Sequence, residues 1–325
     1  MENPMETPTA QQAQANMSFH HVAVIGAGLM GHGIAQVFAE AGLTVHVYDN
    51  VADNLERLHQ RVAENLATMG RGQDCLKRIH ACSTMAAAAT TADIVFEAVA
   101  EDLTVKQKIF GELENYTRPD TVFASNTSVI PITGIMERLQ HKNRALGTHW
   151  WNPPFLIPLV EVVPTQWTDS TVADRVVALL AQVGKEPVRL AKDVAGFIGN
   201  RLQGALWREA IAVVEEGICS AEDVDRVVKA SFGRRLAVLG PLENADLIGT
   251  DLTLAIQRII LPEINSRPGA SPYLEELVKA GRLGMKTGEG FRRWTAEEQA
   301  ALRVRFFDEL VRQLNEPAKD TKTKA

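Results

Sequence analysis

A histidine and a glutamate stand twelve positions apart among apolar, strand-forming residues. His149 comes near the end of the run RALGTHW, and Glu161 lies inside LVEVV. A buried carboxylate is costly unless it has a partner, and a neutral imidazole can accept a proton near pH 7. The pair therefore indicates general base catalysis on a hydroxyl group. His149 would take the proton, and Glu161 would orient the imidazole and stabilise its charged form.

Other polar residues leave more than one interpretation open. Glu161 could instead face solvent at the edge of a strand. The segment Ser125–Ser128 offers hydroxyl and amide groups that would either hold a substrate hydroxyl or cap the helix that follows. Trp150 and Trp151 would either shape a pocket or pack into the core. The remaining histidines are expected to be structural: His20, His21, His32, His46, His59, His80 and His141.

Three glycines have the spacing of a dinucleotide-binding turn. Gly26, Gly28 and Gly31 spell G-x-G-x-x-G directly after the apolar run Val22–Ile25, and a helical pattern follows at once. They would make the turn, let the backbone approach a pyrophosphate, and pack the helix closely against the strand. A glycine turn without a ligand is the alternative.

An acidic residue strengthens the dinucleotide interpretation. Asp49 ends the run LTVHVYD, 18 positions after Gly31. A carboxylate there accepts ribose hydroxyls and repels a 2′-phosphate, which favours NAD over NADP. The residues expected to bind NAD in this region are Gly26, Gly28, Leu29, Met30, Gly31 and Asp49.

The elements that must position these residues follow from the hydrophobic pattern. Up to about Ala191 the strand-like runs HVAVIG, LTVHVYD, DIVFEAV, TVFASN, RALGTHW, LVEVV and PVRLA alternate with helical patterns, among them 51–69, 103–116 and 172–183. This rhythm is typical of βαβ units, whose strands carry ligands at their carboxyl ends. After Lys192 the apolar spacing is helical. We expect a flexible tail over 1–18, a doubly wound α/β domain over 19–192 and a helical domain over 193–325.

Composition narrows the classes of partner. The formal net charge is -6 and no basic stretch could neutralise a row of phosphates, so nucleic acid is not expected. No run approaches the roughly 20 apolar residues of a membrane span, and the first 16 residues are too polar for a secretory signal. Cys75, Cys82 and Cys219 form no C-x-x-C pair, so neither disulfides nor a metal site is expected. The cytoplasm is the expected compartment.

With these motifs in place, the chain resembles the 3-hydroxyacyl-CoA dehydrogenase family, including its carnitine dehydrogenase, gulonate dehydrogenase and lambda-crystallin branch. The matching motifs are VAVIGAGLMG, ASNTS, THWWNPP with LVEVV, KDVAGFIGNRL, GPLENADLIGTDLT and GMKTGEGF. The resemblance implies a Rossmann-like doubly wound sheet domain followed by an all-α C-terminal domain. It also implies NAD-dependent oxidation of a secondary alcohol in a small-molecule substrate, and a homodimer formed through the helical domain.

The resemblance also assigns roles to single residues. The family's catalytic residues fall on His149, Glu161, Ser128 and Asn200. Its cofactor-binding residues outside the glycine turn fall on Glu101, Lys106, Asn152 and Lys286. The hydroxyl and amide groups would polarise the carbonyl that forms at the reacting carbon, and Glu101 and Lys106 would lie near the nicotinamide-side ribose.

The segment where an acyl carrier should bind matches the family unevenly. Residues 51–80 hold the basic residues Arg57, Arg61, Arg71, Lys77 and Arg78 against the acids Asp53, Glu56, Glu64 and Asp74. This balance is a poor cradle for the phosphates of CoA and favours a free hydroxy acid of carnitine or gulonate type. The closing GRLGMKTGEGF instead favours a short-chain 3-hydroxyacyl-CoA. A catalytically idle NAD-binding protein, like lambda-crystallin, is the alternative of another class.

Overall fold

The structure is a computed structural model that describes residues 19–315. The tail expected over 1–18 and the lysine-rich end therefore lie outside the described residues. The described chain divides into two compact units, residues 19–200 with 310–315 and residues 201–309. Within residues 19–315 no helix has the length and apolar character of a membrane span.

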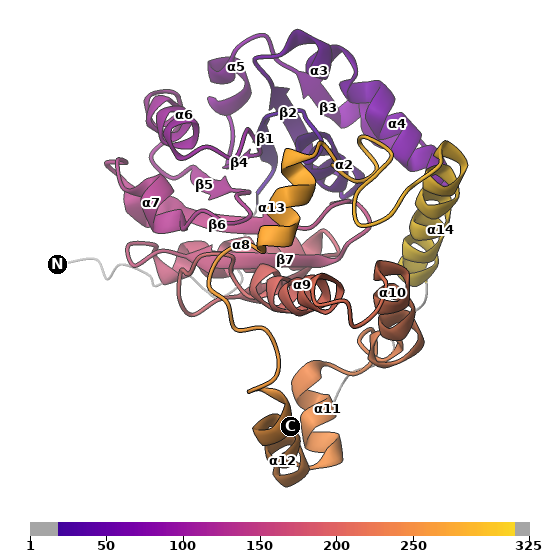
Figure 1. Ribbon diagram of the computed structural model, residues 1–325. Coiled ribbons are helices and arrows are strands. Elements are labelled where there is room, and N and C mark those ends of the chain that lie inside the picture. The colour runs from indigo at the N-terminus through magenta and orange to yellow at the C-terminus, as the bar shows by residue number, and fades with distance from the viewer. Residues whose placement is uncertain (1–18, 316–325) are drawn as a thin grey trace, which may run out of the picture. The chain divides into compact units, whose positions relative to one another are not determined.

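The first unit is built on one eight-stranded sheet, seen in Figure 1. Its strands are β1 (His21–Ile25), β2 (Thr44–Tyr48), β3 (Ile79–Ala81), β4 (Ile94–Glu97), β5 (Val122–Ser125), β6 (Ala145–Trp150), β7 (Leu159–Pro164) and β8 (Glu186–Arg189). Their order is β3-β2-β1-β4-β5-β6-β7-β8, and only the β6–β7 pair is antiparallel. The order in which strands are added to the sheet reverses between β1 and β4, and such a switch point is where ligands bind in open α/β sheets. The expected doubly wound domain is confirmed.

Helices and 3-10 turns connect these strands. They are α2 (Gly31–Glu40), α3 (Ala52–Glu56), α4 (Leu58–Thr68), η1 (Asp74–Arg78), α5 (Met85–Ala89), α6 (Leu103–Tyr116), α7 (Ile132–Met136), η2 (Lys142–Arg144) and α8 (Ser170–Gln182). The helix expected over 51–69 is two helices, α3 and α4, which are interrupted at Arg57. The three-residue strand β3 was not expected, because so short a run carries no alternation.

Aromatic contacts show that the sheet is covered on both faces. Neighbouring residues of a strand point to opposite faces, and Val95 of β4 is in register with Phe123 of β5. Phe123 packs on Phe110 of α6, with ring centroids 5.6 Å apart. Phe96, on the other face, packs on Phe38 of α2 at 4.8 Å. Helices α2 and α6 therefore lie on opposite faces, and the core is divided between them.

After β8 the described chain is helical, as expected. Its elements are α9 (Gly199–Glu215), α10 (Ala221–Ala230), η3 (Phe232–Arg234), α11 (Pro241–Ile248), α12 (Thr250–Ile260), α13 (Pro272–Lys279) and α14 (Ala296–Asn315). Helices α11 and α12 bury no residue within the described chain. They leave large apolar side chains exposed, including Leu242 at 79%, Leu247 at 72% and Ile259 at 73%.

Candidate active site

His149 and Glu161 form a buried pair across two neighbouring strands. The antiparallel register of β6 and β7 places them directly opposite each other. His149 Nδ1 and Glu161 Oε2 are 2.7 Å apart, and the side chains are only 4% and 1% exposed. The solvent-facing alternative for Glu161 is therefore wrong. With Nδ1–H donating to the carboxylate, the neutral imidazole has its lone pair on Nε2, as a general base requires.

The other carboxylate oxygen of Glu161 holds the start of α9. Oε1 accepts the backbone N–H groups of Ile198 at 2.8 Å and Gly199 at 3.0 Å. Burial by itself would raise the pKa of Glu161, but hydrogen bonds from His149, Gly199 and Ile198 outweigh it and hold the pKa below its ordinary value. Glu161 is therefore ionised at neutral pH and can stabilise a protonated imidazole.

Two aromatic rings enclose the imidazole. The ring centroids of Trp151 and Phe197 lie 5.3 and 5.4 Å from that of His149. Phe197 is fully buried with a φ of 50°, a left-handed conformation that is strained for a bulky residue. Gly199 permits the approach of Trp151, because a Cβ there would lie 2.3 Å from the indole. Trp150, by contrast, is 2% exposed and packs in the core.

Ser128 lies in the turn after β5 and is held from two sides. Its backbone N–H donates to Glu101 Oε1 at 2.8 Å, and its carbonyl accepts a hydrogen bond from Asn200 Nδ2, also at 2.8 Å. Ser128 is exposed, so its hydroxyl is open to a ligand. The structure thus brings together Ser128 and Asn200, two residues whose proximity the linear sequence does not show.

The three residues before Ser128 bind groups of the same region. The Ser125 hydroxyl donates a hydrogen bond to Glu97, and the Thr127 hydroxyl donates one to Glu101. The side-chain oxygen of Asn126 accepts the backbone N–H of Trp150. The first backbone N–H groups of α7, those of Ile132 and Thr133, donate to the carboxylate of Asp193 and not to this segment. The interpretation of this segment as a helix cap is therefore wrong, and its side chains instead tie the ends of β4, β5 and β6 together.

The glycine turn after β1 has the geometry of a pyrophosphate cradle. Gly26 has a φ of 101°, and a Cβ there would lie 2.5 Å from the carbonyl oxygen of Ala98. A Cβ at Gly31 would lie 1.7 Å from the Gly26 carbonyl oxygen, so only glycine lets α2 begin so close to the turn. At Gly28 no atom lies within 4 Å of the Cβ position, and the backbone is open to a ligand.

A cavity of about 930 Å³ begins at this turn. Gly26, Gly28 and Asp49 line it, together with residues from 50–54, 83–86 and 98–116. The Asp49 carboxylate is oriented by the backbone N–H groups of Ala27 at 2.7 Å and Val51 at 2.8 Å. This carboxylate beside an open glycine turn fits the adenosine half of a dinucleotide. Leu29, Met30 and Gly31 lie in the turn and at the start of α2, outside the lining of the cavity.

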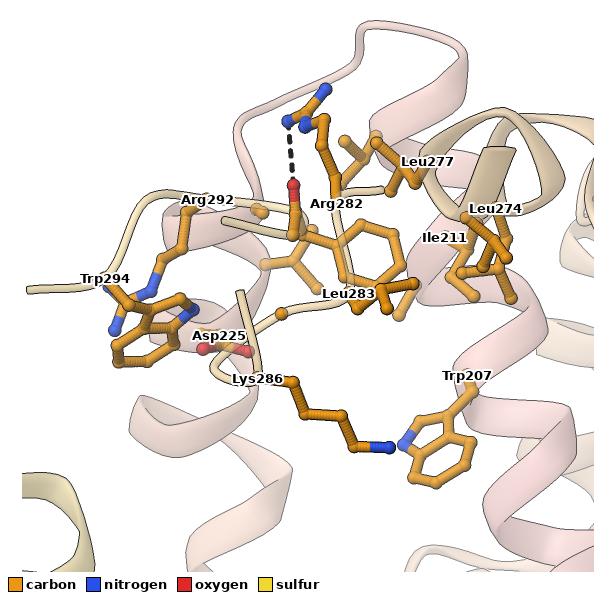
Figure 2. A pocket seen from close by; sticks show the side chains of 18 residues that line it. Trp207, Ile211, Asp225, Leu274, Leu277, Arg282, Leu283, Lys286, Arg292 and Trp294 are labelled. Carbon is orange, nitrogen blue, oxygen red and sulfur yellow. Dashed lines mark hydrogen bonds between the residues drawn. The ribbon is translucent and has the colours of Figure 1, made fainter. Parts of the chain in front are cut away.

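The other expected cofactor residues lie in different surroundings. Glu101 is 37% exposed, whereas the Lys106 side chain is 1% exposed and is enclosed by carboxylates. Asn152 is exposed in the loop after β6. Lys286 lies in the helical unit and lines an apolar cavity of about 660 Å³, where its side chain extends toward Trp207 (Figure 2).

Two buried charged residues near the site were not expected from the sequence. Glu97 is fully buried at the end of β4. Lys185 donates from Nζ to the carbonyls of Pro154 at 2.6 Å and Ile157 at 3.0 Å, and burial lowers its pKa to about 8. Glu97 could have been found, because it is an acid inside the apolar run DIVFEAV, the same pattern that marks Glu161. Nothing in the sequence around Lys185 singles it out.

Two family models match consecutive parts of the chain. Residues 21–194 match the NAD binding domain of 3-hydroxyacyl-CoA dehydrogenase. Residues 196–294 match the C-terminal domain of the same family.

Individual relatives extend over most of the chain. It is 33% identical to 5-formyl-3-hydroxy-2-methylpyridine 4-carboxylate 5-dehydrogenase of Mesorhizobium japonicum, over 90% of this chain and 96% of that protein. It is 34% identical to the human mitochondrial hydroxyacyl-coenzyme A dehydrogenase, over 90% and 96%. A crystal structure of the pyridine carboxylate dehydrogenase, described as an NAD⁺-dependent dismutase, matches with a TM-score of 0.86 and 31% identity, covering 92% of this chain and 99% of that one.

Proposed function

Because the chain belongs to the 3-hydroxyacyl-CoA dehydrogenase family and is an NAD-dependent dehydrogenase acting on a CH–OH group, we propose that its substrate is a small free hydroxy acid. The enzyme oxidises the secondary alcohol of this acid to a ketone. The acid is of carnitine or gulonate type. The observation that carries the chemistry is the buried pair of His149 and Glu161, with Nδ1 and Oε2 2.7 Å apart.

The pair handles the proton of the reaction. His149 Nε2 takes the hydroxyl proton, while the reacting carbon loses its hydrogen as hydride and the C–O bond becomes a carbonyl. Bound NAD supplies the acceptor of that hydride. The imidazolium that results is stabilised by the ionised Glu161, whose Oε1 is fixed by the start of α9. Trp151 and Phe197 limit the access of water to the imidazole.

Further residues are proposed to hold the substrate oxygen and the cofactor. Ser128 offers an exposed hydroxyl, and Asn200 holds the Ser128 turn through its amide. The residues proposed to contact the cofactor are Gly26, Gly28, Leu29, Met30, Gly31, Asp49, Glu101, Asn152 and Lys286. Lys106, whose side chain is buried, is proposed to serve the cofactor site through Glu101.

Three of the five basic residues of the 51–80 segment pair with acids, which supports a free acid over a CoA thioester. Arg57 pairs with Asp53 at 2.9 Å, Arg71 with Glu40 at 2.9 Å and Lys77 with Asp74 at 3.1 Å. Arg61 donates to the Ala27 carbonyl at 3.1 Å. Cations already paired with acids are weak sites for additional phosphates. The relative named for a pyridine carboxylate also acts on an acid without a CoA carrier, whereas the relatives named for hydroxyacyl-CoA favour the thioester as second candidate.

A homodimer and a cytoplasmic location complete the proposal. The exposed apolar side chains of α11 and α12, and the apolar cavity in Figure 2, are two surfaces that a second copy would cover. The three cysteines are free, as is usual for proteins of a reducing compartment.

The test follows NADH absorbance with two kinds of substrate. Carnitine and gulonate are offered with NAD⁺, and acetoacetyl-CoA is offered with NADH, each with separate confirmation of cofactor binding. We expect turnover of a free acid that is lost in His149→Ala and kept in His141→Ala, a matched change at an exposed histidine. Rapid NADH oxidation by acetoacetyl-CoA, with no turnover of free acids, would contradict the free-acid proposal and establish the thioester.

A further inference from the structure

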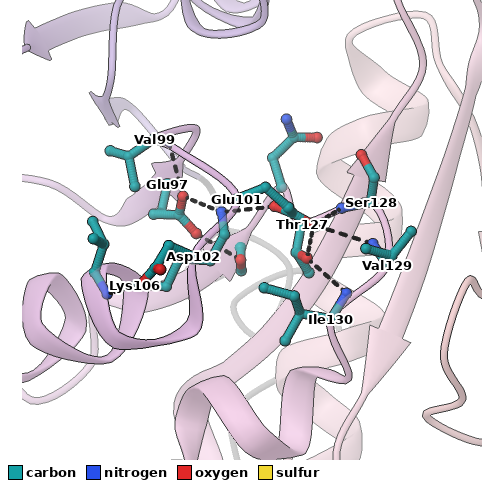
Figure 3. Close-up of polar contacts among 12 residues, drawn as sticks. Glu97, Val99, Glu101, Asp102, Lys106, Thr127, Ser128, Val129 and Ile130 are labelled. Carbon is teal, nitrogen blue, oxygen red and sulfur yellow. Dashed lines mark hydrogen bonds and ion pairs between the residues drawn. The ribbon is translucent and has the colours of Figure 1, made fainter. Parts of the chain in front are cut away.

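Glu97 joins the ends of two strands with a fully buried carboxylate. It stands at the last residue of β4, in register with Ser125 at the last residue of β5. Oε2 accepts the Ser125 hydroxyl at 2.6 Å, and Oε1 accepts the Val99 backbone N–H at 2.9 Å. Oε1 also accepts Lys106 Nζ at 2.7 Å (Figure 3). This fully buried carboxylate therefore accepts three hydrogen bonds, one of them from a lysine.

The contacts continue through Lys106 to Glu101. Lys106 Nζ lies 3.3 Å from Glu101 Oε2, so the ammonium stands between two carboxylates. The Lys106 side chain is 1% exposed, and it therefore offers almost no surface of its own to a ligand. It can influence the site only through the carboxylate that it holds in place.

Glu101 organises the turn that presents Ser128. Its Oε1 accepts the Thr127 hydroxyl at 2.5 Å and the backbone N–H groups of Ser128 at 2.8 Å and Val129 at 3.2 Å. Figure 3 shows these bonds converging on one carboxylate. Burial would raise the pKa of Glu101, but the Thr127 hydroxyl, the Lys106 charge and the two N–H groups together lower it. A charged Glu101 binds the turn more strongly than a neutral one.

We propose that Glu97 is a positioning residue for the reaction: through Lys106 it fixes Glu101, which holds the 127–130 turn and so aims the Ser128 hydroxyl at the substrate. The functional part of this inference rests on the proposed function, because it takes Ser128 as a substrate contact. Lys106 then serves as the counterion that links Glu97 to Glu101.

Stability and positioning can be separated by removing the two buried charges together. Lys106→Met leaves Glu97 buried without its cation, which is destabilising. Glu97→Gln combined with Lys106→Met removes both charges. The glutamine keeps one oxygen, which can accept the Val99 N–H, and an amide group that can donate to the Ser125 hydroxyl. Replacing a buried ion pair by neutral groups of similar volume often restores stability. Glu101 still lacks its ammonium in the double variant. If Glu97 is purely structural, the 127–130 turn should recover together with the stability of the fold. If Glu97 is a positioning residue, the turn should stay loosened.

The experiment measures Tm and amide exchange of residues 127–130 by mass spectrometry. We expect Lys106→Met to lower Tm, and the double variant to recover it. Exchange in 127–130 should remain faster than in the wild type by about tenfold in both variants, because local opening is governed by local contacts. Glu97→Gln alone, the closest isostere, should also accelerate exchange there. If protection of 127–130 returned together with Tm in the double variant, the network would be purely structural and the proposal would be wrong.

A matched control and an activity measurement complete the design. Lys279→Met removes the cation of the exposed Lys279–Glu275 pair and should change neither exchange nor turnover. On the substrate that the wild type accepts, kcat should stay about tenfold or more below wild type in the double variant despite its recovered Tm. Amide exchange needs no substrate, so it decides the role of Glu97 even if no free hydroxy acid is turned over.

Discussion

The two oxygens of Glu161 serve two different elements. Oε2 binds the imidazole of His149, and Oε1 binds the first backbone N–H groups of α9. A single charge therefore orients the imidazole of His149 and fixes the helix start that carries Asn200. Replacing Glu161 therefore changes the hydrogen bonding of His149 and the start of α9 at the same time.

Glu161→Gln should lower kcat by about 10² to 10³-fold, because the imidazolium loses its counter-charge and the Nδ1–H tautomer is no longer favoured.

The contribution of Glu161 to the stability of the fold depends on pH with a definite sign. Since the pKa of Glu161 is lowered in the fold, its charge stabilises the fold above the ordinary carboxyl pKa of about 4.3 and ceases to do so as pH falls further. Chemical denaturation of both proteins should show a stability difference that shrinks below this pH, and a constant difference would contradict the assignment.

The same sequence pattern identifies one buried acid and misses another. An acid inside an apolar strand indicated that Glu161 needs a partner, and the nearby His149 made the inference possible. Glu97 has the same pattern, but its cation Lys106 lies on the following helix, where a lysine looks like an ordinary solvated charge. Only the packing of α6 against the end of β4 shows that Lys106 is buried.

At the scale of elements, the regular strands and long helices were predictable and the irregular connections were not. The helix expected over 103–116 has the bounds of α6, because its apolar spacing is regular. The loop between β6 and β7 has no such periodicity. Its conformation depends on Lys185, which lies between α8 and β8 and binds the carbonyls of Pro154 and Ile157.

The titration of Lys185 gives a prediction for this loop. Burial lowers its pKa to about 8, so between that pH and about 10.5 the folded protein binds fewer protons than the unfolded chain. Stability contributed through Lys185 therefore rises with pH across this window, by up to about 3 kcal/mol. Urea denaturation at pH 7.5 and 10 should show wild type gaining stability relative to Lys185→Met. A difference in unfolding free energy between the two proteins that does not change with pH would contradict the burial of this ammonium.

At the scale of the molecule, the sequence predicted a sheet domain followed by a helical one, but not which apolar faces remain exposed. Helical spacing shows that α11 and α12 are amphipathic. It does not distinguish a face covered by the same chain from one covered by another. In the described chain these helices bury no residue, which is unusual for segments so rich in leucine and isoleucine.

A homodimer formed through these helices should be broken by a charge in the apolar face. Ile259→Asp, at a side chain 73% exposed, should convert the dimer to a monomer in light scattering coupled to size exclusion. The matched variant Val188→Asp, on β8 of the first unit, should leave the dimer intact. A wild type that elutes as a monomer, or an Ile259→Asp variant that remains dimeric, would contradict the interface.

Because Trp151 contacts His149, the fluorescence of Trp151 should depend on the protonation of the imidazole. The two rings are 5.3 Å apart, and Trp151 is partly exposed whereas Trp150 is buried in the core. A protonated imidazole quenches the fluorescence of an adjacent indole, whereas a neutral one does so much less. The emission that disappears in Trp151→Phe should therefore follow the protonation of His149, the proposed base, without substrate and without any added dye.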